Sequence, residues 1–269
     1  MSHQVGMKWI ASFPDNVGRG APRASAVLLL NDYDTGYPFA CLEAGGISAA
    51  RTAASAACAT SVLLEPRTPV SVSFVGAGVI ARTICDYLHE AGVGVTDAGV
   101  HDLDPASAEH LVGHAAGVLG VPVRRCDSLL EALKRDVVVF ATTAAAPYVP
   151  ADVELRAGQL LLNISLRDLA PELLLANDNV VDDDVEHCLK AQTSPHLAEQ
   201  LSGSREFVTG TLAAALRGEV KLDQRRATIF SPFGLGVLDI AVGSLVLEAA
   251  RARGAALEVP GYFGEPTRW

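Results

Sequence analysis

The sequence predicts an α/β protein in which a doubly wound parallel sheet is joined to a smaller, discontinuous α+β domain. Three observations support this fold class. Short apolar segments alternate with helix-forming segments from residue 69 onward, and a glycine-rich turn follows the first of these strands. A hairpin pattern begins near residue 24, and a long apolar segment that could pack on it begins near residue 235. The 269 residues suffice for one large domain or two modest ones.

The smaller domain starts with a predicted hairpin. Residues 24–31 and 37–43 are typical of strands, and the turn-forming sequence DYDTG lies between them. An alanine-rich helix is expected over 46–64, ended near Pro66, and the segment 65–69 is predicted to be a linker.

The C-terminal part is expected to complete this domain. Residues 235–253 form one long apolar segment, which predicts a helix that stops at Gly254. We expect this helix to return to the hairpin. The predicted substrate-binding and dimerisation domain therefore comprises 1–66 and 233–269.

The larger domain, 67–232, follows a strand–helix alternation that is typical of parallel sheets. VSVSFV at 70–75 is a buried type of strand, a helix is predicted over 79–90, and Pro105 opens another because proline is tolerated in a first turn. The further strands are predicted at 93–101, 121–125, 136–141, 159–163 and 179–182.

Charge and cysteine content narrow the function classes. The 31 acidic residues outnumber the 21 basic ones, so the net charge is -10, and a surface of this sign repels nucleic acid and anionic lipid. No apolar segment is long enough for a membrane span, and the first residues do not have the layout of a signal peptide. The five cysteines are scattered without a CxxC pair, which favours a reduced, cytoplasmic protein.

A glycine loop predicts a dinucleotide site. Residues 76–81 read Gly-Ala-Gly-Val-Ile-Ala between a strand and a helix, so that Gly76 and Gly78 permit a tight turn and close approach of a pyrophosphate, while Val79 and Ile80 open the helix. Asp102, at the end of the next strand, is expected to bind ribose hydroxyls. Asp104 is the alternative, or a simple helix cap. Since residues 100–110 contain no Arg or Lys for a 2′-phosphate, NAD is favoured over NADP.

Two later strand ends carry small polar residues. Thr142 and Thr143 follow one strand, and Asn163 and Ser165 end the next. In a Rossmann-type domain these ends face the nicotinamide side of the crevice, so all four residues are candidate cofactor contacts. Plain capping of the strands explains them equally well.

Seven runs of residues resemble the ornithine cyclodeaminase/mu-crystallin family, and within it the SbnB-type dehydrogenases that make 2,3-diaminopropionate. They cover essentially the whole chain: GMKWIASFPDN (6–16), PRASAVLLLNDYDTGYPFACLE (22–43), ISAARTAASA (47–56), NISLRDLAPELL (163–174), VVDDDVEHC (180–188), TSPHLAEQ (193–200) and SPFGLGVLD (231–239).

The resemblance implies an NAD-binding homodimer and assigns site residues. Lys8 and Arg51 match residues that bind the substrate carboxylate, Arg51 beside the cofactor and Lys8 near the reacting carbon. Asp168 matches the proton-transfer aspartate, and Phe233 with Gly234 match a loop that closes over cofactor and substrate. An Arg fork suits a carboxylate, and an Asp can accept the amine proton. The alternatives are a solvated lysine, a helix-surface ion pair and a helix N-cap.

The resemblance further implies the reaction. We expect NAD-dependent oxidation of a secondary amine that joins glutamate to 2,3-diaminopropionate, for siderophore or peptide-antibiotic biosynthesis, with a pyridoxal-phosphate enzyme upstream. Glu172 stands where cyclodeaminases carry a lysine, which disfavours ornithine cyclisation. The family carries a further segment before Gly6, so we expect an N-terminally short domain. The alternatives are an ornithine cyclodeaminase, a ketimine reductase and a non-catalytic dinucleotide-binding protein.

Other polar clusters have ordinary explanations, and no metal site is predicted. His110 and His114 have helical spacing but lack a third ligand. The run Asp182-Asp183-Asp184 is interpreted as acidic residues opening a helix. His196 either contacts the cofactor or substrate, or lies in the first turn of a helix after Pro195.

Overall fold

The computed structural model describes residues 4–64 and 69–264, and contacts between residues divide the chain into two compact units. The smaller unit is Met1–Ile47 with Gly236–Trp269, and the larger is Ser48–Leu235. The predicted division has the same discontinuous form, but it assigns residues 48–66 to the terminal domain. In the structure, the part of helix α1 (Gly45–Leu63) from Ser48 onward packs in the larger unit. The functions of the two domains stay predictions.

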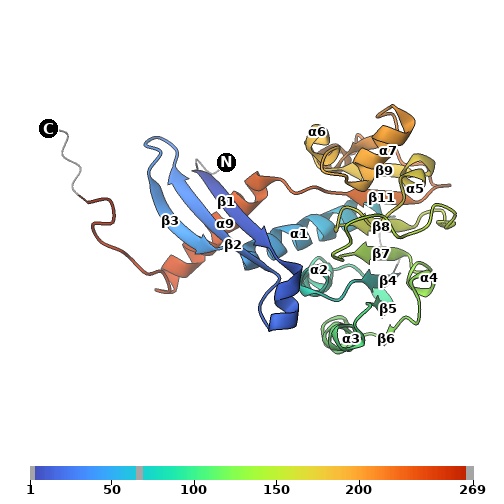
Figure 1. The fold of residues 1–269 in the computed structure, drawn as a ribbon, viewed down its shortest axis with the longest axis horizontal. Helices are drawn as coiled ribbons and strands as arrows, with labels where there is room; N and C mark the ends of the chain where they lie inside the picture. The colour runs from blue at the N-terminus through green and yellow to red at the C-terminus, as the bar shows by residue number, and fades with distance from the viewer. Residues whose placement is uncertain (1–3, 65–68, 265–269) are drawn as a thin grey trace. The chain divides into compact units, whose positions relative to one another are not determined.

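The smaller unit is an antiparallel sheet with one helix packed on it (Figure 1). Within residues 4–64, β1 (Gln4–Ser12), β2 (Ala24–Asp32) and β3 (Pro38–Glu43) pair in that order, with the 3-10 helix η1 (Pro14–Arg19) after β1. The hairpin β2–β3 was predicted, whereas β1 was not. As predicted, the C-terminal helix α9 (Gly236–Ala252) packs on this sheet, around Leu28 and Leu30.

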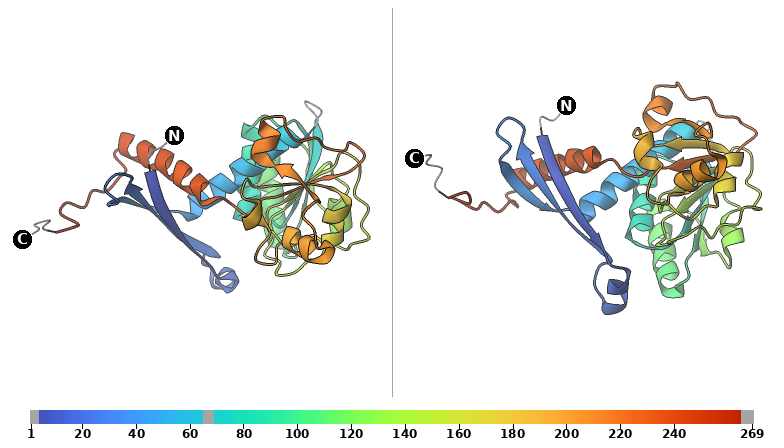
Figure 2. Two further views of the ribbon diagram at one scale, coloured as in Figure 1. Left: turned by 90° about the horizontal axis from the view of Figure 1, so that it is seen from above. Right: turned by 45° about the horizontal axis from the view of Figure 1, so that its top comes forward.

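The larger unit contains a parallel sheet flanked by helices (Figures 1 and 2). Within residues 69–264, eight strands are hydrogen-bonded in the order β10-β9-β11-β8-β7-β4-β5-β6. The strands are β4 (Val70–Val75), β5 (Val95–His101), β6 (Val123–Arg125), β7 (Val137–Phe140), β8 (Leu160–Asn163), β9 (Asp178–Val181), β10 (Val208–Thr211) and β11 (Thr228–Ser231). The chain reverses its direction of travel across the sheet between β4 and β7, which is the switch point at which such sheets bind ligands.

Helices cover both faces of this sheet. The helices of the larger unit are α2 (Val79–Glu90), α3 (Pro105–Leu119), α4 (Leu129–Ala132), α5 (Pro171–Ala176), α6 (Val185–Cys188), α7 (Ser194–Ser202) and α8 (Leu212–Leu216). One core cluster joins the sheet to α1, α2 and α3, and a second joins the opposite face to α4, α5 and α7. The central strands β4, β7 and β8 are buried on both faces, which explains their nearly continuous apolar sequences.

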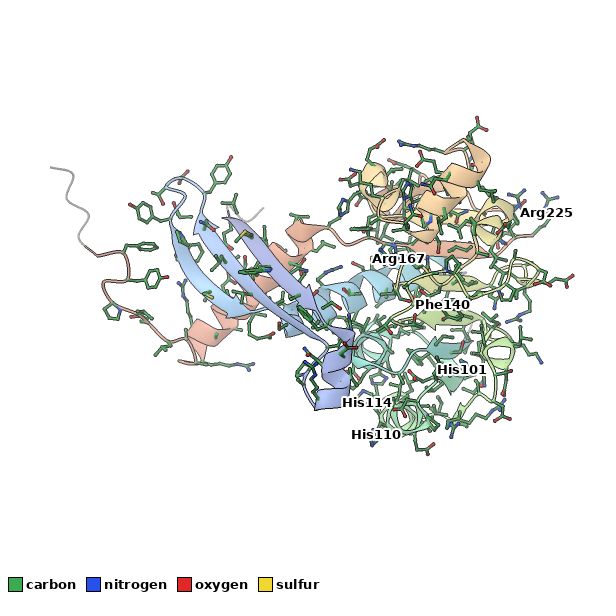
Figure 3. All side chains as sticks on the ribbon, in the orientation of Figure 1. His101, His110, His114, Phe140, Arg167 and Arg225 are labelled. Atoms are coloured by element: carbon green, nitrogen blue, oxygen red, sulfur yellow. The ribbon has the colours of Figure 1, made fainter. Side chains whose placement is uncertain are left out.

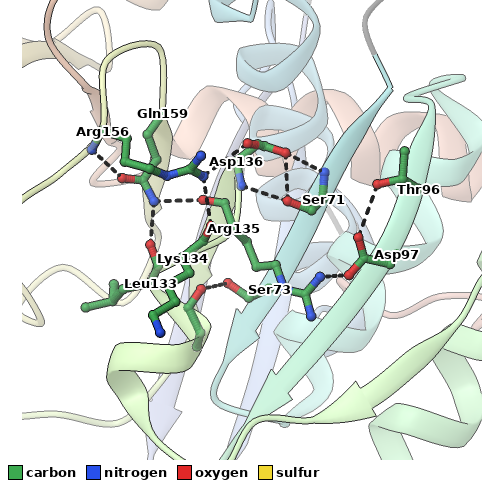
Figure 4. A network of polar contacts seen from close by, with 11 residues as sticks. Ser71, Ser73, Thr96, Asp97, Leu133, Lys134, Arg135, Asp136, Arg156 and Gln159 are labelled. Atoms are coloured by element: carbon green, nitrogen blue, oxygen red, sulfur yellow. Dashed lines mark hydrogen bonds and ion pairs between the residues drawn. The ribbon is translucent and has the colours of Figure 1, made fainter.

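A polar network ties the amino ends of the central strands together (Figure 4). Asp136 accepts hydrogen bonds from the amide of Ser71 at 2.8 Å and from its hydroxyl at 2.7 Å. Buried Gln159 donates to the carbonyls of Leu133 and Arg135, each at 2.7 Å. Since these polar groups satisfy one another, this edge of the sheet serves the fold, and the opposite, carboxyl edge carries the candidate site.

Several predicted elements are confirmed to the residue, and some strands escaped prediction. β4 and α2 occupy the predicted ranges 70–75 and 79–90. Neither β10 nor β11 was predicted, although β11 lies between β8 and β9 in the sheet. Most of the predicted linker 65–69 lies outside the described residues. No helix in the described part of the chain is long and apolar enough to cross a membrane.

Candidate active site

The glycine loop lies at the switch point between β4 and β7. Gly76 has a φ of +92°, and a Cβ there would lie 2.7 Å from the carbonyl carbon of Ala141, against the backbone that follows β7. Gly76 is therefore required by both its conformation and its surroundings. Gly78 is the N-cap of α2 without a side-chain cap, and no atom of the described chain lies within 4 Å of its would-be Cβ. The first amides of α2 thus remain available to an anion.

Asp102 borders this loop. Its carboxylate accepts a hydrogen bond from the amide of Ala77 at 2.7 Å and from that of Asp104 at 2.8 Å, so that it is fixed beside the glycine turn. Asp104 caps α3 by accepting from the amide of Ser107 at 2.9 Å, which leaves Asp102 as the candidate for ribose hydroxyls. Val79 is 53% exposed next to the loop. An open helix terminus, a cradle beside Gly78 and an acidic strand end together fit a dinucleotide without a 2′-phosphate.

Asp168 is enclosed by hydroxyl groups. Its side chain is fully buried, and in the described part of the chain its carboxylate accepts hydrogen bonds from Thr142 at 2.6 Å, from Ser165 at 2.5 Å and from the hydroxyl of Tyr148 at 3.0 Å. Three donated hydrogen bonds compensate for the loss of water around a carboxylate. The structure therefore brings three of the predicted residues, Thr142, Ser165 and Asp168, into one cluster.

Tyr148 is the member of this cluster that the sequence analysis missed. Burial raises the pKa of its hydroxyl, and the neighbouring charge of Asp168 raises the pKa further. Tyr148 consequently keeps its proton and acts as a donor to Asp168. Its backbone amide also donates to the carbonyl of Asp168 at 3.1 Å, which holds the two segments together.

The other two strand-end candidates differ in their surroundings. Asn163 is fully buried, and its amide nitrogen donates to the hydroxyl of Ser231 at 3.1 Å, linking the ends of β8 and β11. Thr143 is exposed beyond the end of β7. Their contacts with a cofactor stay predictions.

Arg51 lies against the turn that follows β11. A Cβ on Gly234, whose φ is +103°, would lie 2.8 Å from Nη1 of Arg51. The amides of Phe233 and Gly234 both donate to Oδ2 of Asp182, the former at 2.7 Å. Burial raises the pKa of Asp182, and the positive charge of Arg51 opposes that rise. Arg51, Phe233 and Gly234 are thus brought together, with Asp182 as a partner that the sequence analysis assigned elsewhere.

That earlier interpretation of Asp182 as a helix-opening residue is wrong, because only Asp184 of the three aspartates caps α6. Asp183 accepts from the amide of Ala213 in α8 at 3.0 Å. The carboxylate of Asp182 instead accepts hydrogen bonds from the turn at Phe233 and Gly234.

Lys8 belongs to the smaller unit and has a buried partner there. Its Nζ donates to Oδ2 of Asp239 at 2.8 Å, and the side chains are 13% and 2% exposed. β1 supplies the lysine and the first turn of α9 supplies the carboxylate. The lysine is therefore held in place, contrary to the alternative of a simply solvated side chain, and its contact with a substrate stays a prediction.

His196 and His114 have structural partners. His196 lies in the first turn of α7, where its Nδ1 accepts from the amide of Gln192 at 3.1 Å. Figure 3 shows His110 and His114 on α3, and His114 pairs with Asp86 of α2 at 2.5 Å. In the described ranges 4–64 and 69–264, no group of three or more His, Cys, Asp or Glu residues could hold a metal ion.

Comparison with known proteins agrees with these features. The sequence profile of the ornithine cyclodeaminase/mu-crystallin family matches residues 1–254. The chain belongs to this family. A curated relative, N-((2S)-2-amino-2-carboxyethyl)-L-glutamate dehydrogenase of Staphylococcus aureus (strain NCTC 8325 / PS 47), is 28% identical over 252 residues, which cover 91% of this chain and 74% of the relative.

Solved structures of the family share the fold. Δ1-pyrroline-2-carboxylate reductase of Thermococcus litoralis, solved with NADH and L-proline, superposes with a TM-score of 0.86 at 28% identity, over 94% of this chain and 80% of that one. An archaeal alanine dehydrogenase dimer with bound NAD gives a TM-score of 0.86 at 24% identity, over 97% of this chain and 82% of that one. The parallel sheet is accordingly a Rossmann-type sheet, as predicted.

Proposed function

We propose that this protein uses NAD to oxidise and hydrolyse a secondary amine in which glutamate is joined to 2,3-diaminopropionate. The products are 2-oxoglutarate, 2,3-diaminopropionate and NADH, and the diaminopropionate serves siderophore or peptide-antibiotic biosynthesis. The chain is an NAD-dependent oxidoreductase of a family that acts on the C–N bonds of amino acids. The Staphylococcus aureus relative supports the choice of substrate.

One observation carries the proposal: three chemically distinct groups lie at the carboxyl edge of the same parallel sheet. The glycine loop follows β4, the Asp168 cluster follows β7 and β8, and Arg51 lies against the turn after β11. These groups suit a pyrophosphate, a transferred proton and a carboxylate, which are the needs of an amino-acid dehydrogenase.

The cofactor site follows from the loop. The amides that begin α2 bind the pyrophosphate, and Gly78 lets it approach because its would-be Cβ position is open. Asp102 binds the ribose hydroxyls and repels a 2′-phosphate. NAD bound at this loop would supply the acceptor for a hydride from the α-carbon of the glutamate part of the substrate.

Arg51 binds a substrate carboxylate. Its planar guanidinium offers two parallel N–H groups to the two carboxylate oxygens. Gly234 leaves room for this guanidinium, since a side chain there would occupy its position. Lys8 is proposed as a further carboxylate-binding residue on the strength of the GMKW match alone, and its charge is already oriented by Asp239.

Asp168 receives the proton of the amine. Because its carboxylate is fully buried, the proton passes through a hydroxyl that touches it: the substrate nitrogen donates to Ser165 or Thr142, whose own proton moves to Asp168. Removal of this proton lets the nitrogen lone pair form the C=N bond as the hydride leaves. Asp168 then returns this proton to the imine nitrogen by the same path and takes one from the water whose hydroxide adds to the imine carbon. It finally gives that proton to the nitrogen as the C–N bond of the carbinolamine breaks, while the carbinol hydroxyl loses its proton to solvent and becomes the ketone of 2-oxoglutarate.

The smaller unit is proposed to form a homodimer through its sheet. The face opposite α9 exposes a set of apolar side chains: Val5, Met7, Trp9 and Val27. Trp9, opposite Val27 across the β1–β2 pair, is 74% exposed. A patch of this kind commonly marks an interface. The five free cysteines fit a cytoplasmic enzyme, and a pyridoxal-phosphate enzyme would supply the substrate.

The decisive test is the absorbance of reduced nicotinamide after the protein is mixed with NAD and the glutamate–diaminopropionate conjugate, with ornithine as a parallel sample. Steady NADH formation with the conjugate alone supports the proposal. Proline formation from ornithine without net NADH would identify a cyclodeaminase. NADH binding without turnover of either compound would identify a non-catalytic dinucleotide-binding protein.

A matched pair of variants assigns the proton path. Asp168→Asn keeps the size of the side chain and removes its charge, and it should lower kcat by about 10² to 10⁴, the usual contribution of a general acid–base group. Asp183→Asn makes the same change on an exposed helix cap and should retain wild-type kcat. Equal rates in both variants would remove Asp168 from the mechanism.

A further inference from the structure

Asp182 is a buried carboxylate, whereas the two aspartates that follow it are exposed and contact helix N-termini. It follows β9 directly and is 4% exposed, whereas Asp183 and Asp184 are exposed and cap α8 and α6. β9 lies beside β11 (Figure 1), and Val181 pairs with Ser231, so Asp182 follows directly at the level of the turn after Ser231. A buried carboxylate is costly unless it is paired, which calls for an account of its contacts.

One oxygen of Asp182 holds the turn. Oδ2 accepts from the amides of both Phe233 and Gly234. Both amides lie between β11 and α9, where Gly234 at a φ of +103° leaves the regular backbone, so the carboxylate accepts hydrogen bonds that no helix or strand accepts there. The ring of Phe233 is fixed separately by an edge contact with His187, with the ring centres 4.1 Å apart.

Arg51 is coupled to the same two groups. Its guanidinium lies against Gly234, so closely that a Cβ would be 2.8 Å from Nη1 and 3.2 Å from Nη2. It also interacts electrostatically with the charge of Asp182. The turn therefore limits where the guanidinium can lie, and the carboxylate determines the charge that it faces.

We propose that Asp182 is a positioning residue for Arg51: its oxygen fixes the Phe233–Gly234 turn, and its charge orients the guanidinium for the substrate carboxylate. The inference rests on the proposed function of Arg51. An arginine side chain has several rotatable bonds, and a two-point contact with a carboxylate requires one orientation of its fork. Fixing that orientation before binding lowers the entropy cost of binding.

A substitution of Asp182 can remove its charge while keeping its hydrogen bonds to the turn. Because both amides donate to a single oxygen, Asp182→Asn can keep that acceptor and lose only the charge. Asp183→Asn makes the same change in charge on the adjacent residue and serves as the matched control. Gly234→Ala disturbs Arg51 from the turn side and leaves Asp182 intact.

The experiment measures kcat and KM for the conjugate, KM for NAD, and the binding of 2-oxoglutarate to the protein–NADH complex by calorimetry. We expect Asp182→Asn and Gly234→Ala to raise KM and to weaken 2-oxoglutarate binding by about tenfold or more, the equivalent of one hydrogen bond to a charged group. In Asp182→Asn, kcat and KM for NAD should change by less than about threefold. Asp183→Asn should match the wild type.

An unchanged or lowered KM in Asp182→Asn would overturn the proposal, because Asp182 would then only support the turn or screen Arg51. A fall in kcat alone would also overturn it. Should Asp182→Asn fail to fold, wild-type KM and 2-oxoglutarate affinity in folded Gly234→Ala refute the positioning of Arg51 by the turn. Failure of the proposed function is distinct: the wild-type protein itself would then neither oxidise the conjugate nor bind 2-oxoglutarate.

Discussion

Replacing Gly76 or Gly78 by alanine adds the same methyl group to two positions of one loop. The structure predicts that the first change mainly lowers stability and the second mainly lowers NADH affinity. At Gly78 the methyl meets open space at a φ of -80°, which any residue adopts. The free energy of unfolding should fall by at most about 1 kcal/mol, since alanine is a poorer N-cap than glycine. NADH affinity should fall about 10- to 100-fold, because the methyl occupies the approach of the pyrophosphate and costs at least one hydrogen bond to a charged group, about 1.5–3 kcal/mol.

At Gly76 the fold itself is affected. The φ of +92° costs a residue with a Cβ about 1–2 kcal/mol. The methyl would also lie 2.7 Å from the backbone carbonyl carbon of Ala141, and overpacking of this kind costs about 1–3 kcal/mol. Gly76→Ala should therefore lose about 2–5 kcal/mol of unfolding free energy.

Two assays separate the variants. Urea unfolding followed by circular dichroism gives the free energy of unfolding, and fluorescence of bound NADH gives the affinity. The reasoning would be refuted if Gly78→Ala bound NADH within about threefold of the wild type, or if Gly76→Ala were as stable as the wild type.

Three other predictions follow from burial and exposure. Tyr148→Phe removes one hydrogen-bond donor from the buried carboxylate of Asp168 and should lower the free energy of unfolding, measured in urea, by about 1.5–3 kcal/mol. A loss below about 0.5 kcal/mol would show that the Tyr148 hydroxyl does not stabilise this carboxylate. Trp9→Glu should convert the proposed dimer to a monomer in light scattering, because it places a charge on the exposed apolar face of the β1–β2–β3 sheet. The control Leu130→Glu changes an exposed residue of the larger unit and should leave the dimer intact. A dimeric Trp9→Glu protein would exclude that sheet face as the interface. Burial, aided by the charge of Asp86, raises the pKa of the Cys85 thiol from 9.0 to about 12. Between these pH values the unfolded chain releases a proton that the folded chain retains, so the free energy of unfolding falls by about 1.4 kcal/mol per pH unit. Cys85→Ala should reduce this slope by that amount, and an unchanged slope would argue against the raised pKa.

Local patterns made most of the fold predictable. The strand at 70–75, the glycine loop and the helix at 79–90 are specified by residues close together in sequence, and the structure has them at those bounds. β11 was missed because only Ile229 and Phe230 of its four residues are large and apolar, whereas β7 (VVVF) and β8 (LLLN) have longer apolar runs. The signal available was the apolar pair Ile229-Phe230, which is followed closely by the breaker Pro232.

The site was predicted less completely, because its partners are distant in sequence. Motif matches identified Asp168 and Arg51, but neither Tyr148, 20 residues before Asp168, nor Asp182, 51 residues before Phe233, has a local signal for its contact. Three consecutive aspartates could have raised doubt, since one helix N-terminus needs a single cap. Only the packing of β9 beside β11 reveals what Asp182 binds.

The buried alanines of helix α1 affect which substitutions this enzyme can accept near Arg51. Its buried positions in the larger unit include Ala53, Ala56, Ala57 and Ala59, so the distance between the helix axis and the sheet is set by methyl groups. Arg51 lies on the same rigid element, and a larger side chain at Ala53 would displace the helix and carry the guanidinium away from Gly234. If Arg51 binds the substrate carboxylate as proposed, its reach is determined by alanines of the helix core, and we expect divergence in substrate length among relatives to involve these alanines as much as the proposed binding residues.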